Sequence, residues 1–577
     1  MQPEFDIELY NERLNSLFTR FQSVQKVGFT GDAYKPGLDG MLRFSAVLGD
    51  PWKAYPCVHV AGTNGKGSVC SLLASALAAG GAVLTGGHPR RAKGTAVSRK
   101  GSPVRALPVR LSPNGPSGRR IGLYTSPHLL DFRERMKIVS GDGFEMISRE
   151  EVWEFLCLYE EAFEGLSFFE ITTGMAFWWF ARQGVDAAVI ETGLGGRLDS
   201  TNIITPVLSV VTSIGLDHCA LLGSTRALIA REKAGIFKPG VPAVVGVRDA
   251  ETAPVFEEVA ASVGAPLVFA SDVPAFSFGQ GSGRFSDEPG ACRLITNEQD
   301  LLSRMDLTGP CQDLNLHTVL VALAILENSE DLGRIRPKAH QVAALEGGPG
   351  APEAENAPGG GPESGTWGEK GPKCTRSVLN AIAEAGKRTG LWGRWQRICE
   401  NPEVICDIGH NPPALKENFA RLEALQAGKQ ENETLTGGGH NESRNGIQAA
   451  GRNLIIVYGI MADKDLAGIA PLMPAKAKYI LAAPDNQRAM RAEELVARLK
   501  ALRPDLDCRV SERPVASKAE AGRDEPAAEA CREGSVAAAV RQALDLAQDL
   551  PNALIYIGGS TFVVAEALPL FNKTTEL

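Results

Sequence analysis

The chain has 577 residues, of which 44% are hydrophobic and 22% charged, as in an ordinary soluble globular protein. It contains 60 Lys and Arg residues and 68 Asp and Glu residues. The resulting net charge of −8 argues against a dedicated nucleic-acid binder. No apolar run approaches the roughly 18 residues of a membrane span, and acidic residues stand where a signal peptide would be basic. The 11 cysteines form no C-x-x-C pair, so we expect reduced thiols in a cytoplasmic protein and no zinc site.

Four segments of the chain are rich in Gly, Pro, Ser or charged residues, and we predict them to be surface insertions or linkers. They are 82–119, 336–375, 426–452 and 511–534. Such compositions bury too little apolar surface to offset the entropy of the chain. The longest Gly/Pro/Glu-rich run, 347–373, is the expected boundary. It divides the chain into a first domain, 1–335, a disordered linker, 336–375, and a second domain, 376–577.

Between these segments, short runs rich in Val and Ile alternate with helical patterns. CVHVAG precedes SVCSLLASALAAG in the first half, and EVICDIG, NLIIVYGI and ALIYIGG follow in the second. Nearly continuous apolar strands separated by helices are typical of parallel sheets that helices cover on both faces. The sequence therefore predicts two α/β domains.

The segment GTNGKGS, Gly62–Ser68, follows the predicted strand CVHVA and precedes a predicted helix. A strand, a glycine-rich loop and a helix N-terminus together bring backbone N–H groups to one point, which favours phosphate. Lys66 can reach the β- and γ-phosphates, and the Ser68 hydroxyl can bind Mg²⁺. The segment departs from G-x-x-x-x-G-K-[ST], because Val60 replaces the first Gly and Gly67 separates Lys66 from Ser68. The alternative is a flexible glycine-rich turn, which the strand and helix context disfavours.

Other polar residues lie where predicted strands end, and each has a plain structural alternative. Ser126 lies in YTSPHL, which is also ordinary turn chemistry. Glu191 ends DAAVIE and offers a hard oxygen ligand beside the loop. His218 and Lys233 follow in GLDHCALLGSTRALIAREKAG, and their spacing alone does not distinguish ligands from structural or surface residues. In the second half, Arg394 could reach a phosphate as an arginine finger does.

Together these stretches resemble the folylpolyglutamate synthase/dihydrofolate synthase family, of the Mur-ligase type. The matching stretches occur in family order and include HVAGTNGKGSVC, GLYTSPHLLDFRERM, FFEITTGMAF, VIETGLGGRLDSTNI, LTGPCQDLN, GLWGRWQ, CDIGHNP and YGIMADKD. The resemblance implies an N-terminal P-loop Mur-ligase-like parallel-sheet domain and a C-terminal Rossmann-like α/β domain.

The resemblance also implies the roles of individual residues. The catalytic residues would be Lys66, Lys233, which matches a carbamylated lysine, and His218. The ATP-binding residues would be Asn64, Gly65, Lys66, Gly67, Ser68, Asn315, Arg394, Asp407 and His410. Two Mg²⁺ ions would be held by Ser68, Ser126, Glu191 and His218. The pterin-side pocket would comprise Ser167, Phe168, Phe169, Leu198, Asp199 and Ser200, and the N-terminal loop KPGLDGM could contribute to it.

The implied activity is ATP-dependent addition of L-glutamate to dihydropteroate or to the γ-carboxyl of folates, through an acyl phosphate. The expected partners are these small molecules, with no nucleic acid and no membrane, and the expected state is a cytoplasmic monomer. Two alternatives stay open: a Mur-type peptidoglycan-precursor amino-acid ligase, and a nucleotide-binding switch without turnover.

Overall fold

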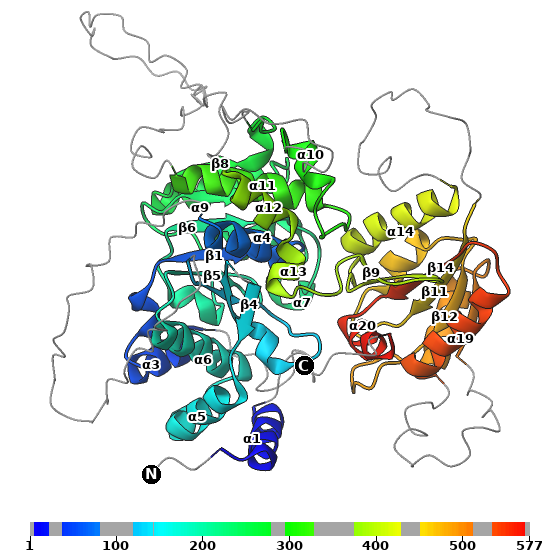
Figure 1. Ribbon diagram of the computed structural model, residues 1–577, viewed down its shortest axis with the longest axis horizontal. Coiled ribbons are helices and arrows are strands. Elements are labelled where there is room, and N and C mark those ends of the chain that lie inside the picture. Colours follow the sequence, from blue (N-terminus) through cyan, green and yellow to red (C-terminus); the bar gives the residue numbers. More distant parts are fainter. Residues whose placement is uncertain are drawn as a thin grey trace, which may run out of the picture.

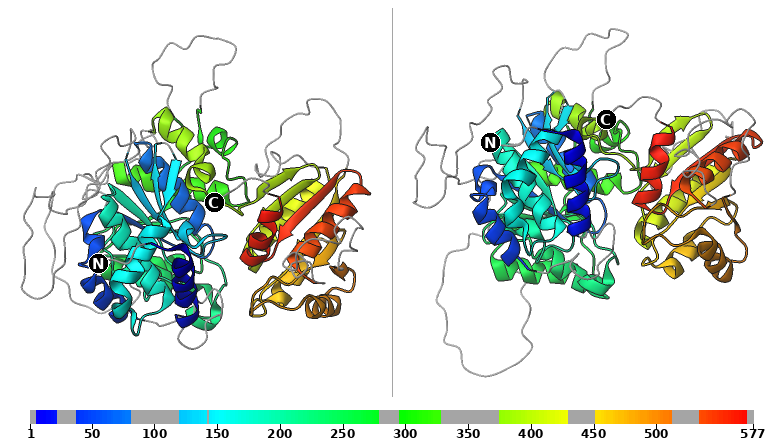
Figure 2. Two further views of the ribbon diagram at one scale, coloured as in Figure 1. Left: turned by 60° about the horizontal axis from the view of Figure 1, so that its bottom comes forward. Right: turned by 90° about the horizontal axis from the view of Figure 1, so that it is seen from below.

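The computed structural model describes residues 5–21, 37–80, 119–141, 143–278, 295–327, 374–428, 451–511 and 534–571. Most of each predicted insertion lies outside these residues, as do the first two residues of the loop KPGLDGM. The described residues form two α/β bodies that lie side by side in all three views (Figures 1 and 2).

The first sheet has eight strands in the order β4-β3-β2-β5-β1-β6-β7-β8. In chain order they are β1 (Cys57–Ala61), β2 (Ile121–Tyr124), β3 (Met136–Ser140), β4 (Gly143–Met146), β5 (Ala187–Glu191), β6 (Leu208–Val211), β7 (Ala243–Val245) and β8 (Leu267–Phe269). The six strands from β2 to β8 in this order pair in parallel, which confirms the expectation for the centre of the sheet. Strands β3 and β4 pair antiparallel, because a connection of two residues cannot cross over between parallel strands.

Helices cover both faces of this sheet, and each face has its own apolar core. One core unites residues of α4 (Lys66–Ala78), α10 (Glu298–Leu302), α11 (Gln312–Glu327) and α12 (Arg376–Ala383). The other face packs against α1 (Ile7–Arg20), α3 (Asp39–Val47), α5 (Arg149–Tyr159), α6 (Phe168–Gln183), α8 (Arg226–Ala234) and α9 (Ala253–Val263). Strand β1 serves both cores, since Val58 and Val60 face α4 while Cys57 and Ala61 face the opposite side.

The second sheet has six strands in the order β13-β12-β11-β14-β10-β9. They are β9 (Gln396–Glu400), β10 (Glu403–Asp407), β11 (Asn453–Tyr458), β12 (Lys478–Leu481), β13 (Asp507–Val510) and β14 (Ala553–Gly558). Only the edge strand β9 is antiparallel. One face packs against α14 (Pro412–Gln426), α16 (Leu466–Ile469) and α17 (Ala492–Leu502), the other against α19 (Val536–Gln548) and α20 (Thr561–Ala567).

The helices α12 and α13 (Ala385–Thr389) pack against α4 of the first body, although the sequence assigned residues from 376 onward to the second domain. Val378, Leu379 and Ile382 are buried in the same core as α4 and α11. Residues 376–389 thus complete the first core, and we propose that the boundary between the domains lies between Thr389 and Gln396.

No helix in the described part of the chain is long and apolar enough to cross a membrane.

The ring of His317 on α11 has acceptors next to both of its nitrogens. Its Nδ1 lies 3.0 Å from both carboxylate oxygens of Glu298, and its Nε2 lies 2.9 Å from the carbonyl oxygen of Ala270. With acceptors at both nitrogens the ring is stable as imidazolium, and the hydrogen bond to Glu298 raises the pKa of His317 above its usual 6.5.

We therefore expect His317→Gln to destabilise the first body by roughly 1–2 kcal/mol at about pH 5.5 and by less at about pH 9. A raised pKa in the folded state contributes stability below pH 6.5, and this contribution is lost as the pH rises through the folded value. Denaturant unfolding of both proteins across this range measures the difference. A difference that does not change with pH would contradict the charged assignment.

Candidate functional site

The polar residues that follow the central strands meet at one edge of the first sheet. Gly62 follows β1, Ser126 follows β2, Glu191 ends β5 and Asp217 follows β6. Strand β1 lies between β5 and β6, so these loops are neighbours. In open α/β sheets, ligands bind outside the carboxyl ends of the strands.

The loop from Gly62 to Lys66 brings the start of α4 to this edge. A Cβ on Gly62 would lie 1.9 Å from the hydroxyl oxygen of Thr212, so the turn out of β1 has room only for glycine. Gly65 begins the helix with a φ of +85°, a conformation that other residues rarely adopt. The predicted strand, glycine-rich loop and helix are therefore present, and Gly62 makes the turn although Val60 departs from the usual pattern.

Two lysines from different helices donate to the same loop carbonyl. Lys66 Nζ lies 3.1 Å from Gly62 O, and Lys233 Nζ lies 2.8 Å from it. Burial, and then the charge of Lys66, lower the pKa of Lys233 to about 7. The loop thus carries a concentration of positive charge that a bound anion would relieve.

A third basic side chain, Arg394, reaches the same place from the segment before β9. Its Nη2 lies 3.4 Å from the position that a Cβ on Gly67 would occupy, and Glu191 Oε2 lies 3.9 Å from that position. Burial lowers the pKa of Arg394, against the opposing effect of the Asp407 and Glu191 carboxylates. The predicted approach of Arg394 to the phosphate loop is thus found in the structure.

Glu191 is 4% exposed, and its Oε2 accepts a hydrogen bond of 3.1 Å from the backbone N–H of Ser126. Burial raises the pKa of Glu191, and the charges of Lys66 and Arg394 oppose this rise. Ser68 is buried nearby at the start of α4, and its hydroxyl accepts from Gln312 Nε2 at 3.3 Å. A buried carboxylate and a hydroxyl beside a phosphate loop are the hard oxygen donors that Mg²⁺ uses together with phosphate oxygens.

His218 lies in the segment after β6, directly before the short helix α7 (Cys219–Leu222). Burial lowers the pKa of His218 to about 3, although the adjacent Asp217 carboxylate opposes this effect. The imidazole is therefore neutral near pH 7, which is the form that binds metals. Within the described residues, no three His, Cys, Asp or Glu side chains are grouped closely enough to hold a metal ion by themselves.

The remaining predicted ATP residues surround the loop, each with partners of its own. Asn315 lies against Gly65, where its Oδ1 is 2.3 Å from the position of an added Cβ, and its amide donates to Gln312. Asp407 accepts from the backbone N–H groups of Trp395 and Gly409, so it braces the segment that carries Arg394. Contact of Asn315 or Asp407 with a nucleotide stays a prediction.

The predicted pterin-side residues lie around the ends of β2 and β5. Phe169 is partly exposed, and its ring covers Gly193 in the loop after β5. Phe168 is buried, and its ring stacks on that of Phe18 in α1 at a centroid distance of 5.0 Å. Leu198 is also partly exposed, and Ser200 is buried at the start of the turn η5 (Ser200–Ile203).

Two of the pterin-side residues are occupied by backbone contacts. Ser167 caps α6 by accepting from the N–H of Glu170, and Asp199 accepts from the N–H groups of Leu194 and Thr201. They shape this region, and a direct contact with a pterin stays a prediction.

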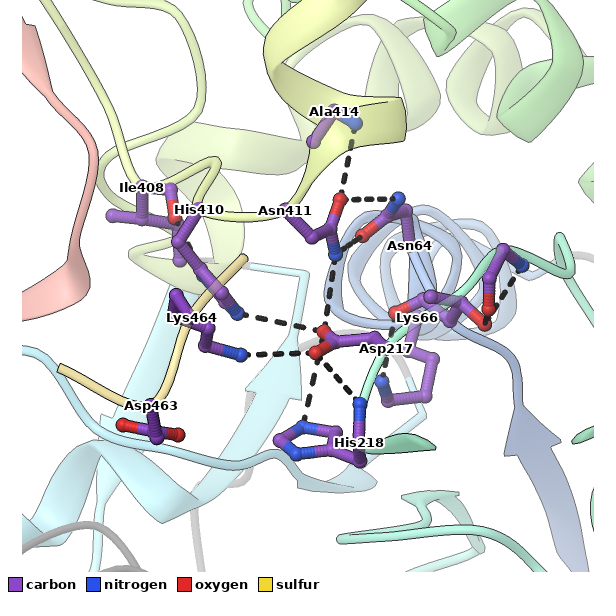
Figure 3. A network of polar contacts seen from close by, with 12 residues as sticks. Asn64, Lys66, Asp217, His218, Ile408, His410, Asn411, Ala414, Asp463 and Lys464 are labelled. Carbon is purple, nitrogen blue, oxygen red and sulfur yellow. Dashed lines mark hydrogen bonds and ion pairs between the residues drawn. The ribbon is translucent and has the colours of Figure 1, made fainter. Parts of the chain in front are cut away.

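Sequence reasoning gave no role to several residues that the structure places at the site. Gln312 links the Ser68 hydroxyl to Asn315. Asn411, at the start of α14, bonds to Asn64 in the phosphate loop, and Lys464, which follows β11, pairs with Asp217 (Figure 3). Only the stretches LTGPCQDLN, CDIGHNP and YGIMADKD could have drawn attention to them.

No family model matches the chain. A curated protein of Haloferax volcanii, a probable bifunctional folylpolyglutamate synthase/dihydropteroate synthase, is 28% identical over 570 residues, which cover 97% of this chain. The dihydrofolate synthase/folylpolyglutamate synthase of Escherichia coli is 28% identical over 467 residues, or 80% of this chain and 81% of that protein. The chain is therefore similar over most of its length to curated proteins named folylpolyglutamate synthase and dihydrofolate synthase. It spans half the length of the Haloferax relative.

A solved structure shares the fold of this chain. The solved structure of E. coli FolC in complex with DHPP and ADP matches with a TM-score of 0.60 at 24% identity, over 97% of each chain. The predicted fold class, two α/β domains of the Mur-ligase type, is thereby confirmed.

We expect Arg394→Ala to lower the rate of any phosphoryl transfer at this site by about 10²–10³-fold, because a cation aimed at the transferred group is lost. Arg397→Ala is the matched control, since Arg397 is exposed on β9 and pairs with Glu403. Steady-state ATP turnover of both variants measures the effect. Equal rates for the two variants would mean that the first domain acts alone.

Proposed function

We propose that this protein is an ATP-dependent ligase that joins L-glutamate to dihydropteroate or to the γ-carboxyl of a folate. The observation that carries the proposal is the meeting of Lys66, Lys233 and Arg394 at one glycine-rich loop, beside the buried carboxylate of Glu191. Similarity to curated relatives supports the choice of substrates, because both are named folylpolyglutamate synthase and the E. coli protein is also named dihydrofolate synthase.

A carboxylate is a poor electrophile, so amide formation needs activation. In the proposed reaction an oxygen of the acceptor carboxylate attacks the γ-phosphorus of ATP, the bond to the β-phosphate oxygen breaks, and an acyl phosphate and ADP result. The glutamate amine then attacks the acyl carbon, loses a proton, and expels phosphate. Lys66, Arg394 and the N–H groups at the start of α4 stabilise the charge on the transferred phosphoryl group.

The residues at the edge of the sheet fit a hard divalent cation, and we propose Mg²⁺ held by Ser68, Ser126, Glu191 and His218 as two ions. The fit rests on Glu191, a buried carboxylate whose Oε2 has one backbone donor and whose ionised form needs a nearby cation. When bound, Mg²⁺ would neutralise charge on the phosphate oxygens.

We further propose that Lys233 acts as a carbamate. Its ammonium would share Gly62 O with Lys66, and like charges at this distance repel. Burial favours the neutral amine, which can add CO₂ from solution with loss of a proton. The product is an anion with hard oxygen atoms, which reverses the sign of the interaction with Lys66 and with a cation.

The pterin would lie against the partly exposed Phe169 and Leu198, with Ser167, Phe168, Asp199 and Ser200 shaping the wall. The proposed partners are therefore ATP, L-glutamate and a pteroyl acceptor, with no nucleic acid and no membrane. The net charge of −8 supports this choice against nucleic acid. A monomeric state and a cytoplasmic location complete the proposal.

The test is the purified protein with ATP, Mg²⁺, L-glutamate and either dihydropteroate or a reduced folate, with the products identified by mass. The proposal expects one added glutamate per ADP released with at least one of the acceptors. Amide formation only with a UDP-sugar peptide would favour a Mur-type peptidoglycan-precursor ligase. Nucleotide binding without any amide would favour a switch.

We expect Lys233→Ala to lose most of the ligase activity, and a short carboxylic acid in the buffer to restore part of it. Lys238→Ala is the control, because Lys238 follows the same helix but donates to Asn202 O rather than to the phosphate loop. Activity is measured in CO₂-depleted and in bicarbonate-containing buffer. Wild-type activity of Lys233→Ala, or activity of the wild type that is indifferent to CO₂ removal, would refute the carbamate.

A further inference from the structure

Four side chains join the two domains beside the phosphate loop, and we call them the junction network: Asn64, Asp217, Asn411 and Lys464 (Figure 3). Asn64 follows β1 and Asp217 follows β6, which are adjacent strands of the first sheet. Asn411 follows β10, and Lys464 follows β11 of the second sheet. The loops at the carboxyl ends of strands in both sheets therefore meet at this point.

The hydrogen bonds of Asn411 are compatible with only one orientation of its side-chain amide. Its Oδ1 accepts from the N–H of Ala414 at 3.0 Å and thereby caps α14. The same oxygen accepts from Asn64 Nδ2 at 3.2 Å, while Asn411 Nδ2 donates to Asn64 Oδ1 at 3.0 Å. Asn411 Nδ2 also donates to Asp217 Oδ2 at 3.1 Å, which fixes the assignment of its nitrogen and oxygen.

Asp217 ties this amide pair to the second domain by charge. Its Oδ1 lies 2.9 Å from Lys464 Nζ, and each of these two side chains is only 12% exposed. The rings of His218 and His410 flank the carboxylate at 3.8 Å and 3.7 Å. An ion pair that is largely shielded from water is screened much less by salt than a surface pair.

The network reaches the reacting region through Asn64, the residue before Gly65 and Lys66. The carbonyl oxygen of Asn64 accepts hydrogen bonds from the hydroxyl groups of Thr212 (2.6 Å) and Ser213 (3.1 Å). Asn411 therefore holds a part of the loop that is fixed to the first sheet. The same second domain carries Arg394, so a contact that seats Asn411 on Asn64 also sets the position of Arg394.

We propose that Asp217 and Lys464 are positioning residues for the ligase reaction, which seat the second domain on the phosphate loop so that Arg394 reaches the transferred phosphoryl group. This inference rests on the proposed function. The two residues act through Asn411 and Asn64 and need not touch either substrate. The apolar cores of the two sheets are separate, so neither fold depends on this contact.

The experiment compares Lys464→Met, Lys464→Arg, Asp217→Asn and the double variant Asp217→Asn/Lys464→Met with the wild type. Lys478→Met is the control, because Lys478 lies in the same domain and is 41% exposed beside Asp507. Each protein is assayed for kcat and for KM of ATP, for affinity towards a non-hydrolysable ATP analogue, and for compaction on binding it by small-angle X-ray scattering. Denaturant unfolding reports the stability of each domain.

We expect Lys464→Met to lower kcat/KM for ATP by about 10- to 30-fold and to reduce the compaction, with unfolding like that of Lys478→Met. Lys464→Arg should retain most of the activity, because it keeps the charge. Since Lys464 acts through Asp217, the double variant should be no worse than Asp217→Asn alone.

Wild-type values of kcat/KM and compaction for Lys464→Met would overturn the proposal, and so would fully additive effects in the double variant. A loss that follows only from lower domain stability would also count against it. If the wild type binds the analogue but forms no amide, the proposed function fails. The junction network is then judged by analogue affinity and compaction alone.

Discussion

The arrangement at the phosphate loop depends on the convergence of positive charge on a few backbone atoms. Lys66 comes from α4, Lys233 from α8, and Arg394 from the segment that leads into the second domain. In the free protein, Lys66 and Lys233 share the carbonyl of Gly62. Lys66, Arg394 and the N-terminus of α4 concentrate positive charge here, which is unfavourable without an anion. We propose that a nucleoside triphosphate supplies the negative charge.

This electrostatic constraint explains why the site needs both domains. The first sheet brings the loop, Glu191 and His218 to one edge. In the proposed function the helix and the glycine turn bind phosphate, and this alone does not provide a reaction. Arg394 adds a positive charge to the site from the second domain's side. Asp407 holds the segment that carries Arg394 by accepting a hydrogen bond from the backbone N–H of Trp395. Because the buried cores of the two sheets are separate, we expect the domains to move relative to one another, and we propose that catalysis depends on how they are seated.

The parts of the site that sequence could predict are those within one local unit. The strand, loop and helix around Gly62–Ser68 follow from adjacent residues, and Glu191 follows from the end of an apolar strand. We propose a later domain boundary than the predicted 376, because α12 packs in the first core, and nothing local distinguishes its apolar face from that of a helix of the second domain. The antiparallel strands β3 and β9 were missed for a similar reason, since pairing direction depends on the connection and on the neighbours in space.

The contacts between the domains could not be derived from periodicity or spacing. Asn64 and Asn411 are 347 residues apart in sequence, and Asp217 and Lys464 are 247 residues apart. The resemblance to the family ranked Arg394 and Asp407 as ATP contacts, but Lys464 and Gln312 drew no prediction. Both residues matter because of the side chains that the fold places next to them, which are Asp217 for Lys464 and Ser68 for Gln312.

The central claim is that the cations at this loop direct the γ-phosphoryl group of ATP onto an acceptor carboxylate. The most direct measurement uses an acceptor in which both oxygen atoms of the reacting carboxylate are ¹⁸O, incubated with the protein, ATP, Mg²⁺ and L-glutamate. The account predicts that the released inorganic phosphate contains one ¹⁸O atom for each amide formed. Amide formation with unlabelled phosphate, or with the label in AMP, would contradict it.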